Sequence, residues 1–146
     1  MSEPQETVML QRSLMAVGMT IVLGVPAAFA PHAFTAEFDA KSPVKLSGSV
    51  IRVEWINPHT WIHLAVKKAG GGTEEWMIEG GTPNTLFRRG VTRESLKPGQ
   101  ELVVDGYRAK DKSMRANGRD ITLPDGRKLF LGSSGTGAPG GDPPGK

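Results

Sequence analysis

Two of the three histidines and two of the three tryptophans of this 146-residue chain fall within nine residues, at positions 55–63. From His59 to Val66 two sets of side chains alternate strictly, and period two places them on opposite faces of a β-strand. If the aliphatic set fills a core, the histidines and tryptophan of the other set share the outer face. The predicted ligand-binding residues are Trp55, His59, Trp61 and His63.

A metal site is the alternative chemistry for these histidines. Side chains at i and i+4 of a strand lie about 13 Å apart at about 3.3 Å per residue, so His59 and His63 do not chelate one ion in a regular strand. Either histidine can pair with a third ligand such as His32, and imidazole ligands of this kind suit copper or zinc. Two histidines without thiolates nevertheless form a weak metal signature. The structural alternative is that His59 hydrogen-bonds the strand entry after Pro58 while the tryptophans cover the sheet.

Other chemistries lack the residues they need. The chain contains no cysteine, which excludes disulfides, thiolate zinc sites, iron–sulfur clusters and cysteine nucleophiles. No H-E-x-x-H, P-loop or G-x-S-x-G pattern occurs, and the G-x-G-x-x-G match at 135–140 precedes no helix. We therefore expect no enzyme activity, and no cofactor apart from copper or zinc in the alternative.

The charged residues of the chain are predicted to be solvated. The basic residues between 108 and 128 are interpreted as a polar loop, with an anion-binding patch as the functional alternative. The carboxylates Glu74, Glu75 and Glu79 are expected to keep a strand soluble.

The elements that position these residues are mostly strands. The composition, with 38% apolar and 23% charged residues, is typical of a soluble globular chain. We expect a strand over 44–56 with a bulge near Gly48, a helix over 82–89 and a polar loop over 110–119. The other expected strands cover residues 59–66, 74–79 and 102–107 and a hairpin of 120–123 with 128–131. This order predicts an all-β fold with one short helix, an OB-like five- to six-stranded small barrel over 44–131, with a small sandwich as the alternative.

The two ends have the composition of a secretion signal and a tail. Residues 13–25 form an apolar run after Arg12, too short for the about 20 residues of a membrane span, and small residues follow it. We expect residues 1–27 to be a signal peptide, with cleavage after residue 30 as the alternative and Met9 as an alternative start. Residues 28–43 form an N-terminal segment, and the Gly/Pro-rich stretch 132–146 is predicted to be disordered.

A set of short motifs resembles the small exported bacterial proteins grouped as domain of unknown function 6152. The motifs are His32–Phe34, Ala36–Asp39, Val53–His59, Glu79–Gly81, Pro83–Asn84, Arg88–Gly90, Ser95–Gly99, Gly106–Asp111 and Leu123–Arg127. The resemblance implies an envelope protein of one barrel domain with no established activity. Such proteins typically begin with His-His-Ser-Phe after the signal, whereas this chain has Pro31-His32-Ala33-Phe34, which removes one potential ligand. His32 and His59 remain as the positions that match the histidine motifs of the family.

The functional expectation combines export with the aromatic and histidine face. We predict a non-enzymatic periplasmic binding module whose partner is a small ligand, a glycan or an envelope protein. Export makes nucleic acid an unsuitable partner, and the membrane is expected to be met only through the signal segment before cleavage. The alternative is a copper- or zinc-handling protein that uses His32 and His59.

Overall fold

The computed structural model describes residues 32–132, so the predicted signal peptide and most of the predicted tail lie outside the described residues. The elements are α1 (His32–Glu37), β1 (Phe38–Glu54), β2 (Trp61–Lys67), β3 (Thr73–Glu79), α2 (Pro83–Arg88), β4 (Glu101–Ala109), β5 (Arg115–Thr122) and β6 (Lys128–Phe130). Neither helix is long and apolar enough to cross a membrane.

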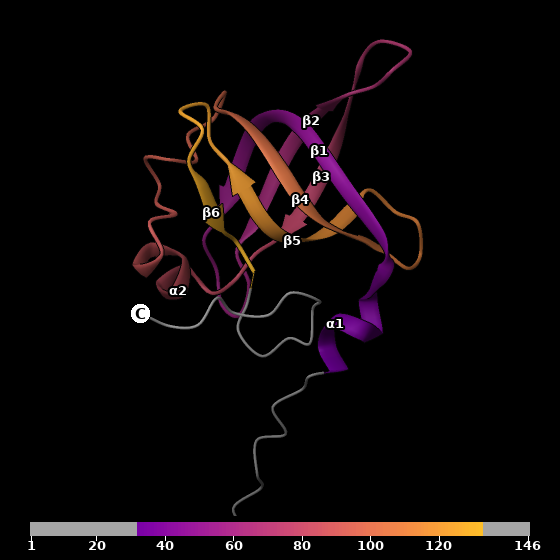
Figure 1. Cartoon of the computed structure of the whole chain (residues 1–146), viewed down its shortest axis with the longest axis horizontal. Helices are drawn as coiled ribbons and strands as arrows, with labels where there is room; N and C mark the ends of the chain where they lie inside the picture. The colour runs from indigo at the N-terminus through magenta and orange to yellow at the C-terminus, as the bar shows by residue number, and fades with distance from the viewer. Residues whose placement is uncertain (1–31, 133–146) are drawn as a thin grey trace, which may run out of the picture.

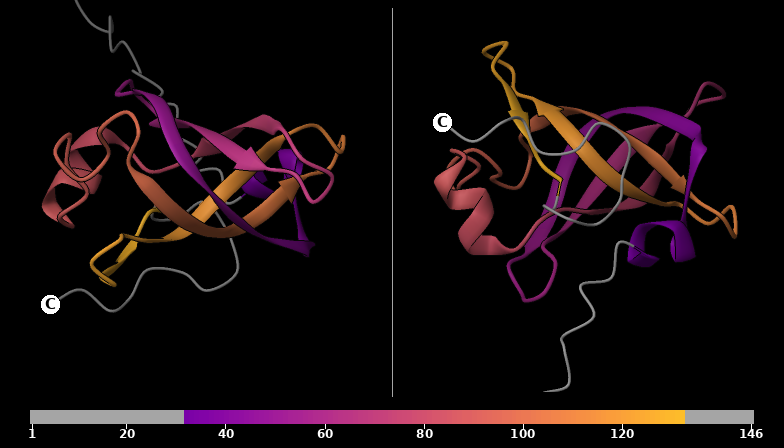
Figure 2. Two further views of the ribbon diagram at one scale, coloured as in Figure 1. Left: turned by 90° about the horizontal axis from the view of Figure 1, so that it is seen from above. Right: turned by 60° about the horizontal axis from the view of Figure 1, so that its bottom comes forward.

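One sheet curls into a closed ring. Its strand order is β3-β2-β1-β4-β5-β6, and every neighbouring pair in that order is antiparallel. The ring closes because β3 also pairs with β5 in parallel, with Met77 opposite Arg115 and Glu79 opposite Asn117 (Figure 1). This confirms the predicted OB-like, small barrel-like all-β fold. The helices α1 and α2 lie on opposite sides of the barrel in all three views of Figure 1 and Figure 2.

The first strand begins at Phe38, six residues before the expected position, and its bulge also differs from the prediction. The β1–β2 register shifts between Val50 and Arg52, so the extra residue is Ile51 rather than one near Gly48. Val50 points into the core whereas Ile51 is exposed, which produces the change of phase. Gly48 allows close approach of strands instead, because a Cβ there would lie 2.2 Å from the Ala65 carbonyl oxygen.

The expected polar loop over 110–119 is half strand, since β5 begins at Arg115. Its inward positions carry Ala116 and Gly118, which are too small to produce a hydrophobic alternation in the sequence. A Cβ on Gly118 would meet the Leu131 side chain at 2.5 Å and Ile78 at 2.8 Å. The side chains of Leu131, directly after β6, and of Ile78 on β3 therefore fill the core above β5.

Two apolar clusters hold the elements together. The main one fills the ring and includes Ile62 and Leu64 of β2, as the alternation predicts, and Leu86 of α2. The predicted helix α2 has its expected cap, because the Thr82 hydroxyl accepts from the Thr85 amide at 3.3 Å. The second cluster consists of Phe34, Phe38 and Ala109, with Tyr107 packed against it. It attaches α1, a one-and-a-half-turn helix that the sequence pattern did not predict.

Candidate functional site

The structure places the four predicted ligand-binding residues in three different environments. His63 belongs to a charged network on the outer face of β1, β2 and β3. His59 and Trp61 lie where β3 and β5 close the ring. Trp55 packs against α2, where its ring centroid is 4.9 Å from that of Phe87.

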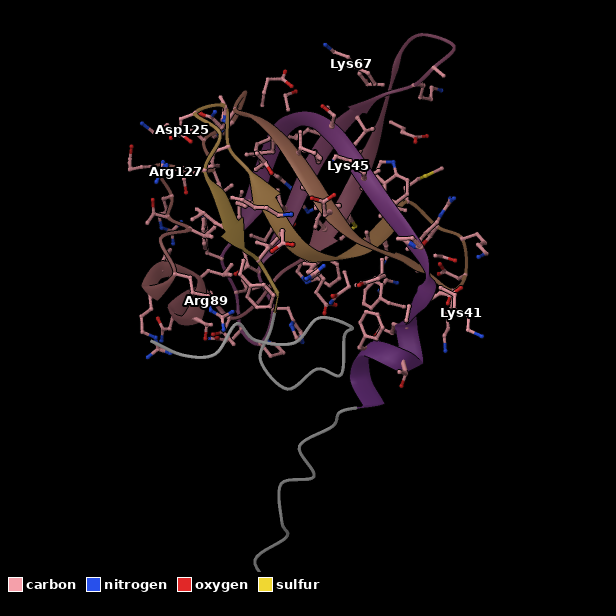
Figure 3. The ribbon with its side chains drawn as sticks, in the orientation of Figure 1. Lys41, Lys45, Lys67, Arg89, Asp125 and Arg127 are labelled. Atoms are coloured by element: carbon pink, nitrogen blue, oxygen red, sulfur yellow. The ribbon has the colours of Figure 1, made fainter. Side chains whose placement is uncertain are left out.

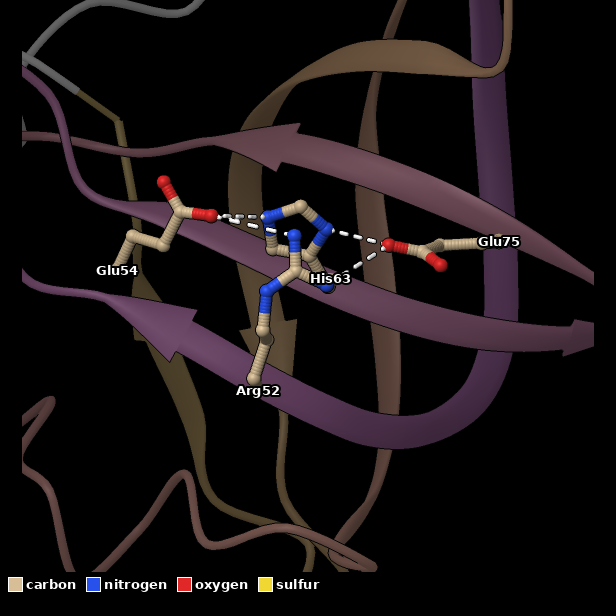
Figure 4. Close-up of polar contacts among 4 residues, drawn as sticks. All are labelled: Arg52, Glu54, His63 and Glu75. Atoms are coloured by element: carbon tan, nitrogen blue, oxygen red, sulfur yellow. Dashed lines mark hydrogen bonds and ion pairs between the residues drawn. The ribbon is translucent and has the colours of Figure 1, made fainter.

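Four side chains form the charged network of Figure 4, which consists of Arg52, Glu54, His63 and Glu75. His63 Nδ1 lies 2.6 Å from Glu75 Oε1, and Nε2 lies 2.9 Å from Glu54 Oε1. Arg52 bridges the same two carboxylates, at 3.1 Å to Glu75 and 3.3 Å to Glu54. The strand register explains this, because Arg52 is directly opposite His63 and the glutamates lie diagonally across from it.

His63 is consequently buried, with 2% of its surface exposed, and the expectation that it lies on an open ligand face is wrong. A carboxylate only accepts, so both contacts are hydrogen bonds when both ring nitrogens carry a proton. The hydrogen bond from His63, with desolvation opposing it and Arg52 adding to it, holds the pKa of Glu75 below its usual value. The network therefore occupies both nitrogens of His63.

The second environment centres on Glu79 at the end of β3. Asn117 Nδ2 donates to Glu79 Oε1 at 3.2 Å, and His59 Nδ1 lies 3.6 Å from the same oxygen. His59 Nδ1 also lies 3.3 Å from the Gly80 carbonyl oxygen. Glu79 is buried, so the expectation that it keeps a strand soluble is wrong. The cause is the β3–β5 pairing, which covers Glu79 with a strand distant in the sequence.

Burial is the main reason that the pKa of Glu79 is raised, and the negative charge of Glu37 acts in the same direction. The charge of His59, the hydrogen bond from Asn117 and the charge of Arg115 oppose the shift. A carboxyl group that holds its proton more strongly than usual can donate a hydrogen bond as well as accept one.

Arg115, the first residue of β5, connects Glu79's surroundings to α1. Its guanidinium forms an ion pair with Glu37 and lies 5.7 Å from the ring centroid of Trp61 and 5.9 Å from that of Phe38. Trp61 is half-buried, and the Arg115 guanidinium covers one face of its indole.

These residues form one site, which we call the closure site and define as His59, Trp61, Glu79, Arg115 and Asn117. Two loops border it, residues 55–60 between β1 and β2 and residues 110–114 between β4 and β5. In OB-type barrels the face of strands two and three and these two loops bind ligands. Sequence reasoning found His59 and Trp61 but missed the other three, because their proximity depends on strands that are distant in the chain.

His59 is the histidine best placed to hold a metal ion. A carbonyl oxygen only accepts, so Nδ1 donates to Gly80 and the lone pair of the neutral ring is on Nε2. Nε2 has no hydrogen-bond partner within residues 32–132. His32 begins α1, but its side chain lies outside the described residues. In the part of the chain that is described, no three His, Asp or Glu side chains are grouped to hold a metal ion.

The basic residues of the last third of the chain are largely occupied by protein groups. Lys128 lies 3.5 Å from both Asp105 and Asp120, on the wall of a cleft of about 310 Å³. Arg108 donates to the Lys112 carbonyl oxygen at 2.6 Å and lies over the Trp76 ring. These contacts favour the interpretation of this region as structural rather than as an open anion-binding patch.

Comparison with known proteins assigns the chain to a family of unknown function. A search of curated proteins finds no match to the chain. The model of a family of unknown function, DUF6152, matches residues 20–118, which include both loops of the closure site and every one of its residues. By this match and by the motifs from His32 onward, the chain belongs to the DUF6152 family.

Proposed function

We propose that this chain is an exported, non-enzymatic binding module of the periplasm, and that the closure site holds its ligand. The observation that carries the proposal is the arrangement of Trp61, His59 and Arg115 around the buried Glu79, between the two loops that OB-type barrels use for binding.

The chemistry of the site suits a small polar ligand with an apolar or sugar-like face. The indole of Trp61 provides a surface for stacking, while His59 and Arg115 provide hydrogen-bond groups.

Native mass spectrometry of the protein released from the periplasm tests this proposal. We expect a bound non-protein mass on the wild type, and its loss in a Trp61→Ala, Arg115→Ala double variant. The matched control is Arg52→Ala, which removes a comparable surface cation from the network of Figure 4. A wild type without any bound mass, or a double variant that keeps it, contradicts the proposed site.

Export has its own test. Because the apolar run ends at Val25-Pro26-Ala27, the intact mass of periplasmic material should show the loss of the first 27 residues, or alternatively 30. Recovery of the full-length chain from the cytoplasm contradicts export while leaving the binding site open to separate test.

A second candidate function is copper or zinc handling through His59 and His32. The favouring observation is that His59 Nδ1 contacts the Gly80 carbonyl oxygen and lies near Glu79. Contacts of this kind to one ring nitrogen orient a histidine that binds a metal ion through the other. Metal analysis of untagged protein should then show that the bound metal is lost in His59→Ala. The metal should be retained in His63→Ala, because both ring nitrogens of His63 already have protein partners. Equal metal content in the wild type and His59→Ala rejects this function.

A further inference from the structure

A second surface, distinct from the closure site, lies where the loop after β1 meets α2. We call it the α2 patch and define it as Trp55, Ile56, Phe87, Arg88 and Arg93. The Trp55 and Phe87 rings stack at 4.9 Å with a tilt of 31°, and the Arg93 guanidinium lies 5.3 Å from the Trp55 ring centroid. Stacking therefore fixes an aromatic pair and a cation together at one place on the barrel.

The apolar part of the patch is exposed. Ile56 is 51% exposed and Phe87 is 38% exposed, and they are two of the four large apolar side chains left exposed within residues 32–132. Phe87 lies on the outer side of α2, one residue after Leu86, which is buried in the core. Phe87 stacks on Trp55, and Ile56 is the next residue in the chain, so the two exposed apolar residues belong to one part of the surface. Exposed apolar residues that are close together typically mark a site of interaction.

The charge around the apolar part is positive. No carboxylate of residues 32–132 forms an ion pair with Arg88 or Arg93. The nearest acidic residue in the sequence, Glu94, is paired with Lys97. The patch thus presents apolar side chains beside two cations whose charges are not balanced locally.

We infer that the α2 patch binds the surface of a membrane that contains anionic phospholipids, a membrane contact in addition to the one expected of the signal segment. Aromatic and apolar side chains enter the region between headgroups and acyl chains, while arginines contact lipid phosphates from the same face. Ile56 and Phe87 supply the exposed apolar groups. Arg93 lies over the Trp55 ring, and Arg88 follows Phe87 at the end of α2, so both cations adjoin these groups. The barrel would then lie against the membrane through α2, on the opposite side from α1 (Figure 1).

The test is vesicle sedimentation of the full chain in the form that the cell produces. The vesicles are phosphatidylcholine alone or mixed with phosphatidylglycerol. Each basic residue near an anionic surface contributes about fivefold to partitioning, so Arg88→Ala, Arg93→Ala should lower binding to the mixed vesicles about 25-fold. Ile56→Ser, at an exposed position, should lower it without removing charge.

The matched control is Lys67→Ala, Lys68→Ala, which removes the same two charges at the β2–β3 hairpin. Lys67 lies on a different side of the molecule from Arg89, the residue that directly follows α2 (Figure 3). The control should bind within a few-fold of the wild type, with unchanged circular dichroism in every variant. Equal losses in the two charge variants, or no wild-type preference for phosphatidylglycerol, overturn the inference. Binding to a poly-glutamate peptide without binding to vesicles also overturns it, in favour of an acidic protein partner.

Discussion

The packing beneath the closure site can be tested with a pair of substitutions that compensate for each other. Leu131 is fully buried, and its side chain lies against Gly80, whose carbonyl oxygen holds His59. A Cβ at Gly80 would lie 3.1 Å from Leu131 Cδ1, 3.2 Å from Cγ and 3.3 Å from its carbonyl oxygen. Gly80→Ala alone therefore overpacks this position, whereas Leu131→Ala alone leaves a cavity.

The magnitudes follow from those contacts. Truncation of a buried leucine to alanine costs about 2–5 kcal/mol of unfolding free energy. Overpacking at Gly80 costs about 1–3 kcal/mol, offset by about 0.4–1 kcal/mol because alanine restricts the unfolded chain. In the double variant two of the three close contacts are absent, so Gly80→Ala should be neutral or stabilising. The double variant should then be more stable than the sum of the single changes by about 1–3 kcal/mol.

Urea unfolding followed by circular dichroism measures the four free energies of this cycle, with the slope of each transition as a check on two-state behaviour. The control cycle pairs Gly80→Ala with Leu102→Ala, a buried leucine that is not among the nearest neighbours of a Cβ at Gly80. That pair should be additive within about 0.5 kcal/mol. The same additivity in the Leu131 cycle would refute the packing described here.

Four further predictions concern the site and the strands around it. Because the pKa of Glu79 is raised, this carboxyl group loses its proton at a lower pH in the unfolded chain than in the folded one. The unfolding free energy should therefore fall as pH rises from the usual carboxyl range to the raised pKa, and the urea midpoints of Glu79→Gln should not show this fall. The lowered pKa of Glu75 has the opposite sign, so its stabilisation should be present at neutral pH and lost on acidification, and Glu75→Gln should be less sensitive to acid. Gly48→Ala should lower the melting temperature by several degrees, since its Cβ would meet a backbone oxygen at 2.2 Å, and an unchanged melting temperature contradicts the β1–β2 register. Trp61→Ala should cost less than the about 3–5 kcal/mol of a fully covered tryptophan, because Trp61 is half-buried, and thermal unfolding measures the difference.

Local features of this protein could be predicted from the sequence alone. The alternation from His59 to Val66 predicts β2 and its core face, and Thr82-Pro83 predicts the start of α2. The Pro124-Asp125-Gly126 turn predicts the last hairpin, whose strands pair as expected. Each of these signals depends on residues that are close together in the sequence. Local backbone geometry and neighbouring side chains are therefore enough to determine the strand, the helix start and the hairpin.

Other features depend on which strands become neighbours, and no local pattern contains that information. Period two assigns His63 to the outer face of β2, but only the pairing of β1 and β3 with β2 shows that Arg52 and two glutamates cover it. Glu79 has the sequence appearance of a solvated strand carboxylate, yet parallel pairing with β5 buries it beside Asn117. The sequence thus determined the type and face of the strands, whereas the closure of the ring decided which polar side chains meet, because that pairing joins segments more than thirty residues apart.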